Sequence, residues 1–345
     1  KQLLTQLETV NERNNYNLQL QGYGTTNSKS LKRLFDQSID YKPNVILYRD
    51  SAGWCPYCEK IWLQLEEKRI PYEIIKINMR CYGDKPSEFM RLNPSGTLPV
   101  AIINNQVITE SNVIMSKLEE LFPLNNPLLP TLISNPNKYN RIQGLYALER
   151  KIFSTWFSWL TSRAAATSAG SMDYYLTILE HELSKDSSGP YFLGDMFSLV
   201  DIMFTPFLER MAASLPYFKG YEIRTSKFPY LLAWYEAMDS RETYQGIKSD
   251  YYTHCHDLPP QIGYCHSLEG SEQFSQEIDG EAWTVTRSPN DCFEPMIPKD
   301  EGIARRDAVR QSIYNHENLV KFCLRGVGSP GFPKVSAPLA GQKTN

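Results

Sequence analysis

The sequence has no apolar run close to the about 20 residues that a membrane-spanning helix needs. It also lacks an excess of basic charge, because 36 lysines and arginines stand against 39 acidic residues and give a net charge of −3. Neither a nucleic-acid footprint nor a polybasic membrane anchor is therefore expected. With 41% hydrophobic and 22% charged residues, the composition is that of a globular protein rather than a disordered one.

Cysteine is scarce, with seven residues in a chain of 345. An odd number of cysteines in a large chain argues against the disulfide framework of small secreted domains and favours a reducing compartment. The thiols are those of Cys55, Cys58, Cys81, Cys255, Cys265, Cys292 and Cys323.

The pattern between residues 44 and 124 predicts an α/β domain. We expect strands over 44–48, 72–77, 98–103 and 106–109, and helices over 59–69 and 111–122. The first two strands are joined through a helix, so they should be parallel by a right-handed crossover. Asn104-Asn105 should turn the last two strands into an antiparallel hairpin.

After a proline-rich linker, apolar residues recur with the helical period, which predicts an all-α domain over 133–245. We expect helices over 138–162, 172–183, 198–213 and 228–238. The third helix opens on Ser198-Leu-Val-Asp201, a capping-box pattern, so a structural role is expected for Asp201. Aromatic residues at helical spacing in the first helix are expected to pack in the core rather than line an acceptor pocket. They are Phe153, Trp156, Phe157 and Trp159.

Both ends of the chain look different from the two domains. Residues 1–43 are rich in Asn, Gln and Ser, which predicts a short helix or arm followed by a flexible lead-in. Residues 246–345 are predicted to be a C-terminal extension, irregular over 250–300 and with one helix over 304–324. Ordering each residue costs about 1–2 kcal/mol of backbone entropy, so such a stretch should lie on the two domains or on another protein. The two domains are expected to fold without it.

The motif Cys55-Pro-Tyr-Cys58 follows the first strand and opens the first helix. A helix N-terminus offers free N–H groups and the positive end of the helix dipole, and both stabilise a thiolate. Pro56 fits the first turn because its missing N–H costs nothing there. Cys58 lies one turn on, near enough to attack a mixed disulfide on Cys55. We interpret Cys55 as a nucleophile and Cys58 as its resolving thiol.

Two other interpretations of the two cysteines are half of a zinc site and a pair of inert core thiols. A structural zinc site needs a second pair of ligands. His254-Cys255-His256 and Cys265-His266 bring together residue types that bind zinc or iron, but their spacing fits no known zinc finger. A structured docking segment is the preferred interpretation of this stretch, and metal binding stays open.

The motif Cys55-Pro-Tyr-Cys58 resembles that of glutaredoxins. The run Leu92-Asn-Pro-Ser-Gly-Thr-Leu-Pro-Val100, followed by Ile108-Thr-Glu-Ser111, resembles the thioredoxin-like domain of glutathione transferases. Phe192-Leu-Gly194 and Ser198-Leu-Val-Asp201 look like the folding motif of their helical domain. The resemblance covers about residues 44–245. It implies a thioredoxin-like glutathione-binding domain over 44–124, followed by a helical domain of the glutathione-transferase type over 133–245.

The resemblance also implies a glutathione site. Pro99 matches the cis-proline that lies beside the active thiol in this family, and the backbone of Leu98 would pair with the cysteinyl part of glutathione. Glu110 and Ser111 match the pair that holds the γ-glutamyl carboxylate and amine. Ser111 begins a helix, a suitable place for a carboxylate, although a simple N-cap is an alternative role.

One departure from the glutaredoxin pattern concerns the basic residue that usually stands shortly before the motif. Here Ala52-Gly-Trp54 precede the first cysteine. Arg49 and Arg91 are the candidates for holding the glycyl carboxylate of glutathione in its place.

A catalytic cysteine resembles the reductase-type members of the family rather than the serine and tyrosine classes. The implied activity uses glutathione as cosubstrate for deglutathionylation, disulfide reduction or dehydroascorbate reduction of a small-molecule or protein substrate. The dithiol and the extensions at both ends most resemble the iota class of photosynthetic organisms, which implies a chloroplast, with the cytoplasm as the alternative. A second hypothesis is a transferase-like scaffold that docks to a larger assembly through its extensions.

Overall fold

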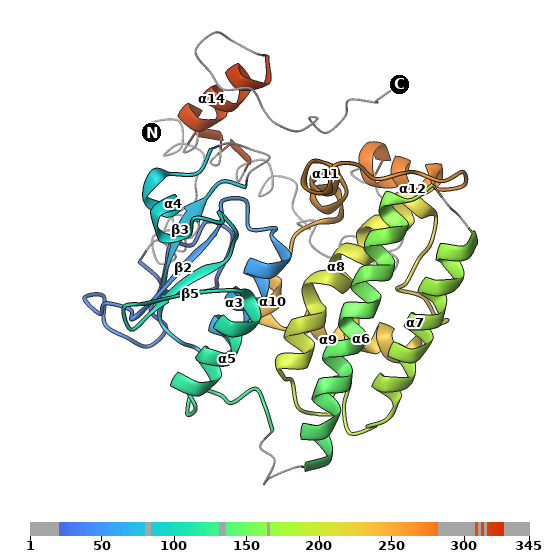
Figure 1. Cartoon of the computed structure of the whole chain (residues 1–345), viewed down its shortest axis with the longest axis horizontal. Coiled ribbons are helices and arrows are strands. Elements are labelled where there is room, and N and C mark those ends of the chain that lie inside the picture. The colour runs from blue at the N-terminus through green and yellow to red at the C-terminus, as the bar shows by residue number, and fades with distance from the viewer. Residues whose placement is uncertain are drawn as a thin grey trace.

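The computed structural model describes residues 21–79, 84–130, 136–163 and 166–281, and the short stretches 308–309, 312–313 and 316–327. Figure 1 shows two parts next to each other, a β-sheet with its helices and a group of long helices. Within these ranges, none of the helices combines the length and the apolar character that a membrane crossing requires.

The sheet has five strands in the order β1-β3-β2-β4-β5. They are β1 (Lys32–Arg33), β2 (Val45–Asp50), β3 (Tyr72–Ile77), β4 (Val100–Ile103) and β5 (Gln106–Thr109). The parallel pairing of β2 with β3 and the antiparallel β4–β5 hairpin are confirmed. Asn104 and Asn105 have φ angles of 49° and 66°, the left-handed conformation that a tight hairpin turn needs.

Three helices accompany the sheet: α3 (Pro56–Glu67), α4 (Ser87–Leu92) and α5 (Ser111–Leu121). Helix α3 is buried along almost its whole length, since it packs against α5 on one side and against the helical part on the other. Its Ile61, Trp62 and Leu65 belong to the main core. The short helix α4 was not expected, because it spans less than two turns and leaves no periodic pattern.

The helical part contains α6 (Pro136–Thr161), α7 (Ala166–Ser184), α8 (Leu199–Lys219), α9 (Pro229–Ser240) and α10 (Glu242–Gln245). Helix α8 lies at its centre, packs against both α3 and α6, and is buried on nearly every side. Of the four aromatic residues expected in the core of α6, Trp156 and Trp159 are buried, Phe153 is half-buried and Phe157 is exposed.

The start of α8 has the predicted capping box. The Ser198 hydroxyl accepts a hydrogen bond from the backbone N–H of Val200 at 3.2 Å, and the Asp201 carboxylate accepts one from the N–H of Ser198 at 2.9 Å. Asp201 also accepts from the indole N–H of Trp234 at 3.0 Å. Every one of these partners is structural, which confirms the expected role of Asp201.

Residues 21–43 are not a detached lead-in. β1 pairs with β3, and Leu34 is fully buried. Arg33 forms an ion pair with Glu66 of α3 at 2.7 Å, and the indole N–H of Trp62 donates to Thr26 at 3.1 Å. The prediction of a flexible lead-in is therefore wrong for residues 21–43. Polar side chains that the sequence suggested to be solvated form an ion pair and a hydrogen bond with buried side chains of α3. The expected arm over residues 1–20 lies outside the described residues.

The prediction of an irregular stretch after residue 250 is wrong for α11 (Tyr251–Ile262), α12 (Glu272–Gln276) and the short π-helix η2 (Glu277–Glu281). The Asp250 side chain caps α11 by accepting from the N–H of Thr253 at 2.7 Å. Tyr251, Cys255 and Leu258 then reach the core next to α8. Figure 1 shows α11 next to α8. The segment was expected to lie on the two domains, and it does, but as part of their core.

Helix α14 (His316–Gly326) overlaps the helix predicted over 304–324 and ends two residues beyond it, and most of the first part of that prediction lies outside the described residues. Of its described apolar side chains, Leu319 and Val320 are about half exposed, at 49% and 54%, and Leu324 is partly buried. The proposed domain boundaries at residues 44, 124, 133 and 245 stay predictions.

Candidate active site

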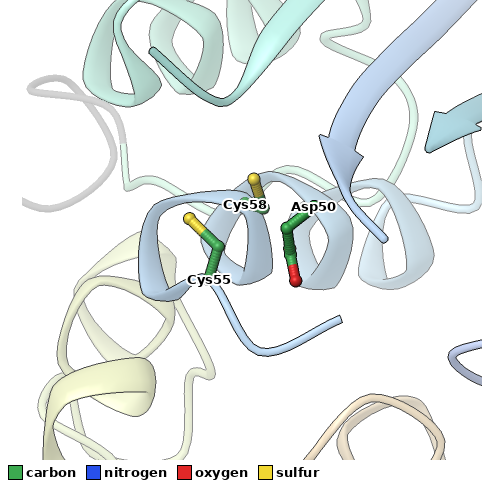
Figure 2. Close-up of side chains that lie close together, drawn as sticks. All are labelled: Asp50, Cys55 and Cys58. Carbon is green, nitrogen blue, oxygen red and sulfur yellow. The ribbon is translucent and has the colours of Figure 1, made fainter. Parts of the chain in front are cut away.

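A sharp turn between β2 and α3 positions the two cysteines (Figure 2). One carboxylate oxygen of Asp50, Oδ2, accepts hydrogen bonds from the N–H groups of Gly53 at 2.6 Å and Trp54 at 2.8 Å. Gly53 has a φ of 85°, which a residue with a side chain rarely adopts. The turn then delivers Cys55 to the N-cap of α3 and Pro56 to the first helical position, as predicted.

The sulfur atoms of Cys55 and Cys58 lie side by side on the first turn of α3 (Figure 2). Both thiols are free and almost fully buried, with 3% and 1% of each residue exposed. Burial raises the pKa of the Cys58 thiol well above its usual value, and its hydrogen bond with Cys55 adds to this effect. Cys58 is therefore a thiol at neutral pH, which suits a resolving residue that reacts second.

Two buried cations that no sequence pattern singled out lie near Cys55. Lys60 and Arg210 are 1% and 2% exposed, and each interacts electrostatically with the Cys55 sulfur. Burial lowers the pKa of Lys60 to about 8, so the ammonium still carries its charge at neutral pH. Both cations therefore lie beside the thiol at the N-terminus of α3. Arg210 comes from α8, so only the tertiary fold brings it to this site.

Arg210 joins the cysteine turn to the C-terminal segment. Its guanidinium donates to the carbonyl of Trp54 and, at 2.9 Å, to Glu59 of α3. Glu209, the neighbouring residue on α8, accepts from the Tyr244 hydroxyl at 2.8 Å and contacts the imidazole of His254. A continuous buried ion cluster thus runs from the turn before Cys55 to helix α11.

The two carboxyl groups of this cluster titrate in opposite directions. Burial, together with the nearby charge of Glu209, raises the pKa of Glu59 well above its usual value. For Glu209, burial also acts to raise the pKa, but His254 and Arg210 outweigh it and lower the pKa to about 2. Glu209 therefore carries the negative charge that balances Arg210.

The predicted glutathione residues meet at the same edge of the sheet as the cysteine turn. β2 pairs Tyr48 with Val100, and β4 pairs Val100 with Thr109. β2 leads from here into the cysteine turn, and β5 leads into Glu110 and Ser111. The Leu98–Pro99 pair comes directly before β4. The Leu98–Pro99 bond is cis, as predicted. Glu110 has a φ of 67°, and the buried Ser111 is the first residue of α5.

Of the two arginines proposed for the glycyl carboxylate, Arg49 is excluded by its burial, and Arg91 stays a prediction. Arg49 is fully buried, donates to the carbonyl oxygens of Asp50 at 2.7 Å and Ser28 at 2.8 Å, and lies over the ring of Trp62. The proposal is wrong for Arg49, because no part of its guanidinium reaches the surface. The side chain of Arg91 is 73% exposed and lies 4.0 Å from Glu88.

The histidines and cysteines of the possible metal segment separate in the fold. His254 contacts Glu209, whereas His256 contacts Asp279 at 2.7 Å. Cys255 points to the carbonyl of Ala213, and Cys265 lies beside Lys219. Among the described residues, only Asp50, Cys55 and Cys58 bring three ligand-type side chains together.

A cavity of about 350 Å³ opens between α5 and α6. Asn112, next to Ser111, lines one side of it, and Tyr146 and Arg150 line the other. The Arg150 guanidinium also hydrogen-bonds to Tyr57 of the cysteine motif. The cavity therefore extends from the predicted glutathione residues toward the cysteine motif.

The fold and the site define a dithiol protein with a thioredoxin-like domain followed by a helical domain. The family profile for the glutathione S-transferase N-terminal domain matches residues 54–121, and the profile for the C-terminal domain matches residues 164–237. The chain is 31% identical over 202 residues to a rice protein named probable glutathione S-transferase DHAR1, cytosolic; the match covers 58% of this chain and 86% of the relative. The chain belongs to the glutathione S-transferase family.

Two further likenesses agree with this assignment. Glutathione S-transferase DHAR3, chloroplastic, from Arabidopsis thaliana is 28% identical over 203 residues, which cover 58% of this chain and 71% of the relative. The crystal structure of Chlamydomonas reinhardtii dehydroascorbate reductase superposes with a TM-score of 0.54 at 21% identity. The superposition covers 63% of this chain and 98% of that structure, and it shows that the two proteins share a fold. The iota class stays a prediction, since none of these likenesses selects it.

Proposed function

We propose that this protein is a glutathione-dependent thiol transferase or reductase in which Cys55 is the nucleophile. The observation that supports this most strongly is the pair of free thiols at the N-terminus of α3, with Lys60 and Arg210 beside the first of them. Family membership alone does not select this chemistry, because family members with a serine or tyrosine in this position lack the thiol. The cysteine pair is what directs the proposal toward reduction.

In the proposed reaction, the Cys55 thiolate attacks the disulfide of a glutathionylated substrate at the glutathione sulfur. The substrate leaves as a thiol after taking up a proton, and Cys55 is left in a mixed disulfide with glutathione. A second glutathione thiolate then attacks the glutathione sulfur, which releases oxidised glutathione and restores the Cys55 thiolate. If Cys58 attacks Cys55 instead, reduced glutathione leaves and a Cys55–Cys58 disulfide forms, which two further glutathione molecules reduce. The same cysteine reduces a non-thiol acceptor such as dehydroascorbate if two glutathione molecules supply the two electrons.

Glutathione is the proposed cosubstrate, held by the residues at the sheet edge. We assign the backbone of Leu98, exposed by the cis bond to Pro99, to the cysteinyl part of glutathione. We assign Glu110 and Ser111 to the γ-glutamyl end, where the first N–H groups of α5 suit its carboxylate. The cavity between α5 and α6 is the proposed acceptor site, since Arg150 connects it to Tyr57.

The test is a glutathione-dependent assay on the full chain, with a glutathionylated peptide and with dehydroascorbate as substrates. Cys55→Ser should abolish turnover, whereas Cys58→Ser should keep it, because glutathione replaces the resolving thiol. Cys323→Ser is the matched control, since Cys323 is exposed on α14. Full activity in Cys55→Ser would show that the roles are wrong.

The alternative function is a scaffold that docks to a larger assembly through its extensions. The half-exposed Leu319 and Val320 on α14 favour it, because apolar side chains on an exposed helix suit a partner surface. Absence of turnover with every acceptor in the assay above would favour this alternative. We propose a reducing compartment for the protein, with the chloroplast ahead of the cytosol, and relatives carry both locations in their names.

A further inference from the structure

Arg150 is the one charged side chain among the described residues that line the cavity between α5 and α6. Its side chain is 43% exposed, so the guanidinium is open to a ligand in the cavity. The other described lining residues are apolar or uncharged, for example Gln143 and Tyr146. At about 350 Å³ the cavity has the size of a small-molecule site, and its one cation suits a ligand with negative charge.

The Arg150 guanidinium is held in place from two directions. It lies over the rings of Phe153 and Phe207, at 4.7 Å and 4.8 Å from the ring centroids. Two of its N–H donors go to the Glu149 carboxylate and one goes to Tyr57, which leaves two of the five donors of a guanidinium. A fixed guanidinium with spare donors binds a carboxylate well, because little side-chain freedom is lost on binding.

A second cation lies on the same side of the cysteine motif. The Lys60 ammonium is 4.7 Å from the centroid of the Phe207 ring, which Arg150 also covers. It interacts electrostatically with Glu149, Arg150 and Cys55, and it forms no ion pair within 4.0 Å with any described residue. The buried Glu149 carboxylate is therefore shared between two cations.

The two cations bear on which acceptors can reach Cys55. Cys55 attacks as a thiolate, so an acceptor with a carboxylate close to its sulfur meets electrostatic repulsion. Arg150 and Lys60 offset this repulsion for an anionic acceptor. A cationic acceptor would instead approach two further positive charges. The surroundings of the cavity thus distinguish acceptors by their charge.

We propose that Arg150 selects acceptors that carry a carboxylate, and that the cavity takes the carboxylate-bearing half of a mixed disulfide with glutathione. This inference rests on the proposed function. The Cys55 thiolate forms a bond with the glutathione sulfur, and the bond between the two substrate sulfurs breaks. The acceptor half leaves as a thiolate and takes a proton from water while Arg150 holds its carboxylate. Glutathione then restores Cys55, so no other reductant is needed.

The experiment compares mixed disulfides of glutathione whose other half is anionic, neutral or cationic: mercaptoacetate, 2-mercaptoethanol and cysteamine. kcat/KM is measured on the full chain at a fixed glutathione concentration. Each value is divided by the rate constant of the uncatalysed reaction with glutathione, which removes differences in intrinsic reactivity. We expect the anionic substrate to exceed the neutral one by about tenfold, the low end of what a hydrogen bond to a charged group contributes. The cationic substrate should be the poorest.

Variants at two neighbouring positions of α6 test whether Arg150 causes this preference. Arg150→Met removes the charge and keeps an apolar chain over the rings, so the preference for the anionic substrate should disappear. Arg150→Lys should keep part of it. Lys151→Met is the matched control, because it removes a charge from the next residue, which is exposed and does not line the cavity. This control should keep the full preference.

A purely structural role for Arg150 predicts a different pattern. Without it, Tyr57 and Glu149 would each lose a partner, and the cysteine motif would be disturbed whatever the charge of the acceptor. Equal losses for all three substrates in Arg150→Met therefore overturn the inference and leave the proposed function intact. If the native chain turns over none of the substrates, the proposed function and the inference fall together.

The native chain also gives a measurement that needs no variant. The preference for the anionic substrate should shrink between about 0.01 M and 1 M ionic strength, because the screening length falls from about 30 Å to about 3 Å. A native chain that turns over the three substrates equally well at low salt would contradict the proposal, even if Arg150→Met failed to fold.

Discussion

The cysteine turn and helix α11 approach the same buried ion cluster from opposite sides, but they are held in different ways. The turn is fixed by residues close in sequence, since Asp50 binds the N–H groups three and four residues later. Helix α11 is fixed by distant partners, because His254 contacts Glu209 of α8 and Leu258 enters the shared core. Arg210 connects the two regions through the Trp54 carbonyl. The C-terminal segment therefore helps to hold the charged residues around Cys55, although the turn that carries Cys55 is fixed by residues close to it in sequence.

The largest effect should come from removing the segment that contains α11. Truncation after Gln245 deletes Tyr251, Cys255 and Leu258 from the core and exposes α8, and each such loss costs about 2–5 kcal/mol. We expect the free energy of unfolding in urea to fall by most of a domain's total stability. Truncation after residue 281 is the control and should change it little. Equal unfolding midpoints for the two truncations would show that α11 is dispensable.

The two histidines of α11 offer a matched pair. His254→Ala leaves Glu209 buried beside Glu59 with one partner fewer, and should cost about 3 kcal/mol. His256→Ala breaks a half-exposed contact with Asp279 and should cost less than about 1 kcal/mol. Denaturant unfolding of both variants would measure the two losses of unfolding free energy. Equal losses would show that the buried contact stabilises the fold no more than the half-exposed one.

The same cluster predicts an acid dependence. The pKa of Glu209 is lowered to about 2 in the folded protein, against about 4.3 for an ordinary glutamate. Its ionised form therefore contributes stability that is fully present above about pH 4.3 and is lost as the pH falls through about 2. In His254→Ala the pKa of Glu209 should rise, so the loss should begin at a higher pH in an acid titration of stability.

The smallest effect concerns the cation next to Cys55. Because burial lowers the pKa of Lys60 to about 8, its charge costs stability below about pH 8, and this cost fades as the pH rises toward about 10.4. Lys60→Met should therefore be more stable at neutral pH. It should also slow alkylation of Cys55 a few-fold below pH 8, with the difference shrinking above it. Faster alkylation would contradict a supporting role for Lys60.

The parts that sequence predicted well are those encoded by neighbouring residues. The hairpin at Asn104-Asn105 and the capping box at Ser198 each depend on a few consecutive side chains, and both are present. The position of Cys55 at the start of α3 follows from the strand before it and from Pro56. These features need no knowledge of distant partners.

Helix α11 was missed although its sequence holds a helix signal. Asp250 is a good N-cap, and Tyr251, Cys255 and Leu258 recur with helical spacing, but Pro259 and Pro260 suggested an irregular stretch. Each proline removes one helical N–H, but both stand in the last turn and the helix ends at Ile262, two residues beyond them. Lys60, Arg210 and Asp50 were missed for another reason. Their roles depend on contacts made only in the folded chain, such as the one between Arg210 and Trp54.

Alkylation of the reduced full chain tests the central claim that Cys55 is the reactive thiol. The two thiols are three residues apart and equally buried, so accessibility alone predicts similar rates. We expect Cys55 to react more than about tenfold faster than Cys58 at neutral pH, since burial raises the pKa of Cys58 well above its usual value and so keeps it a thiol. Peptide mapping of iodoacetamide adducts against time, on Cys55→Ser and Cys58→Ser, would measure both rates. Equal rates at the two positions around neutral pH would contradict the account.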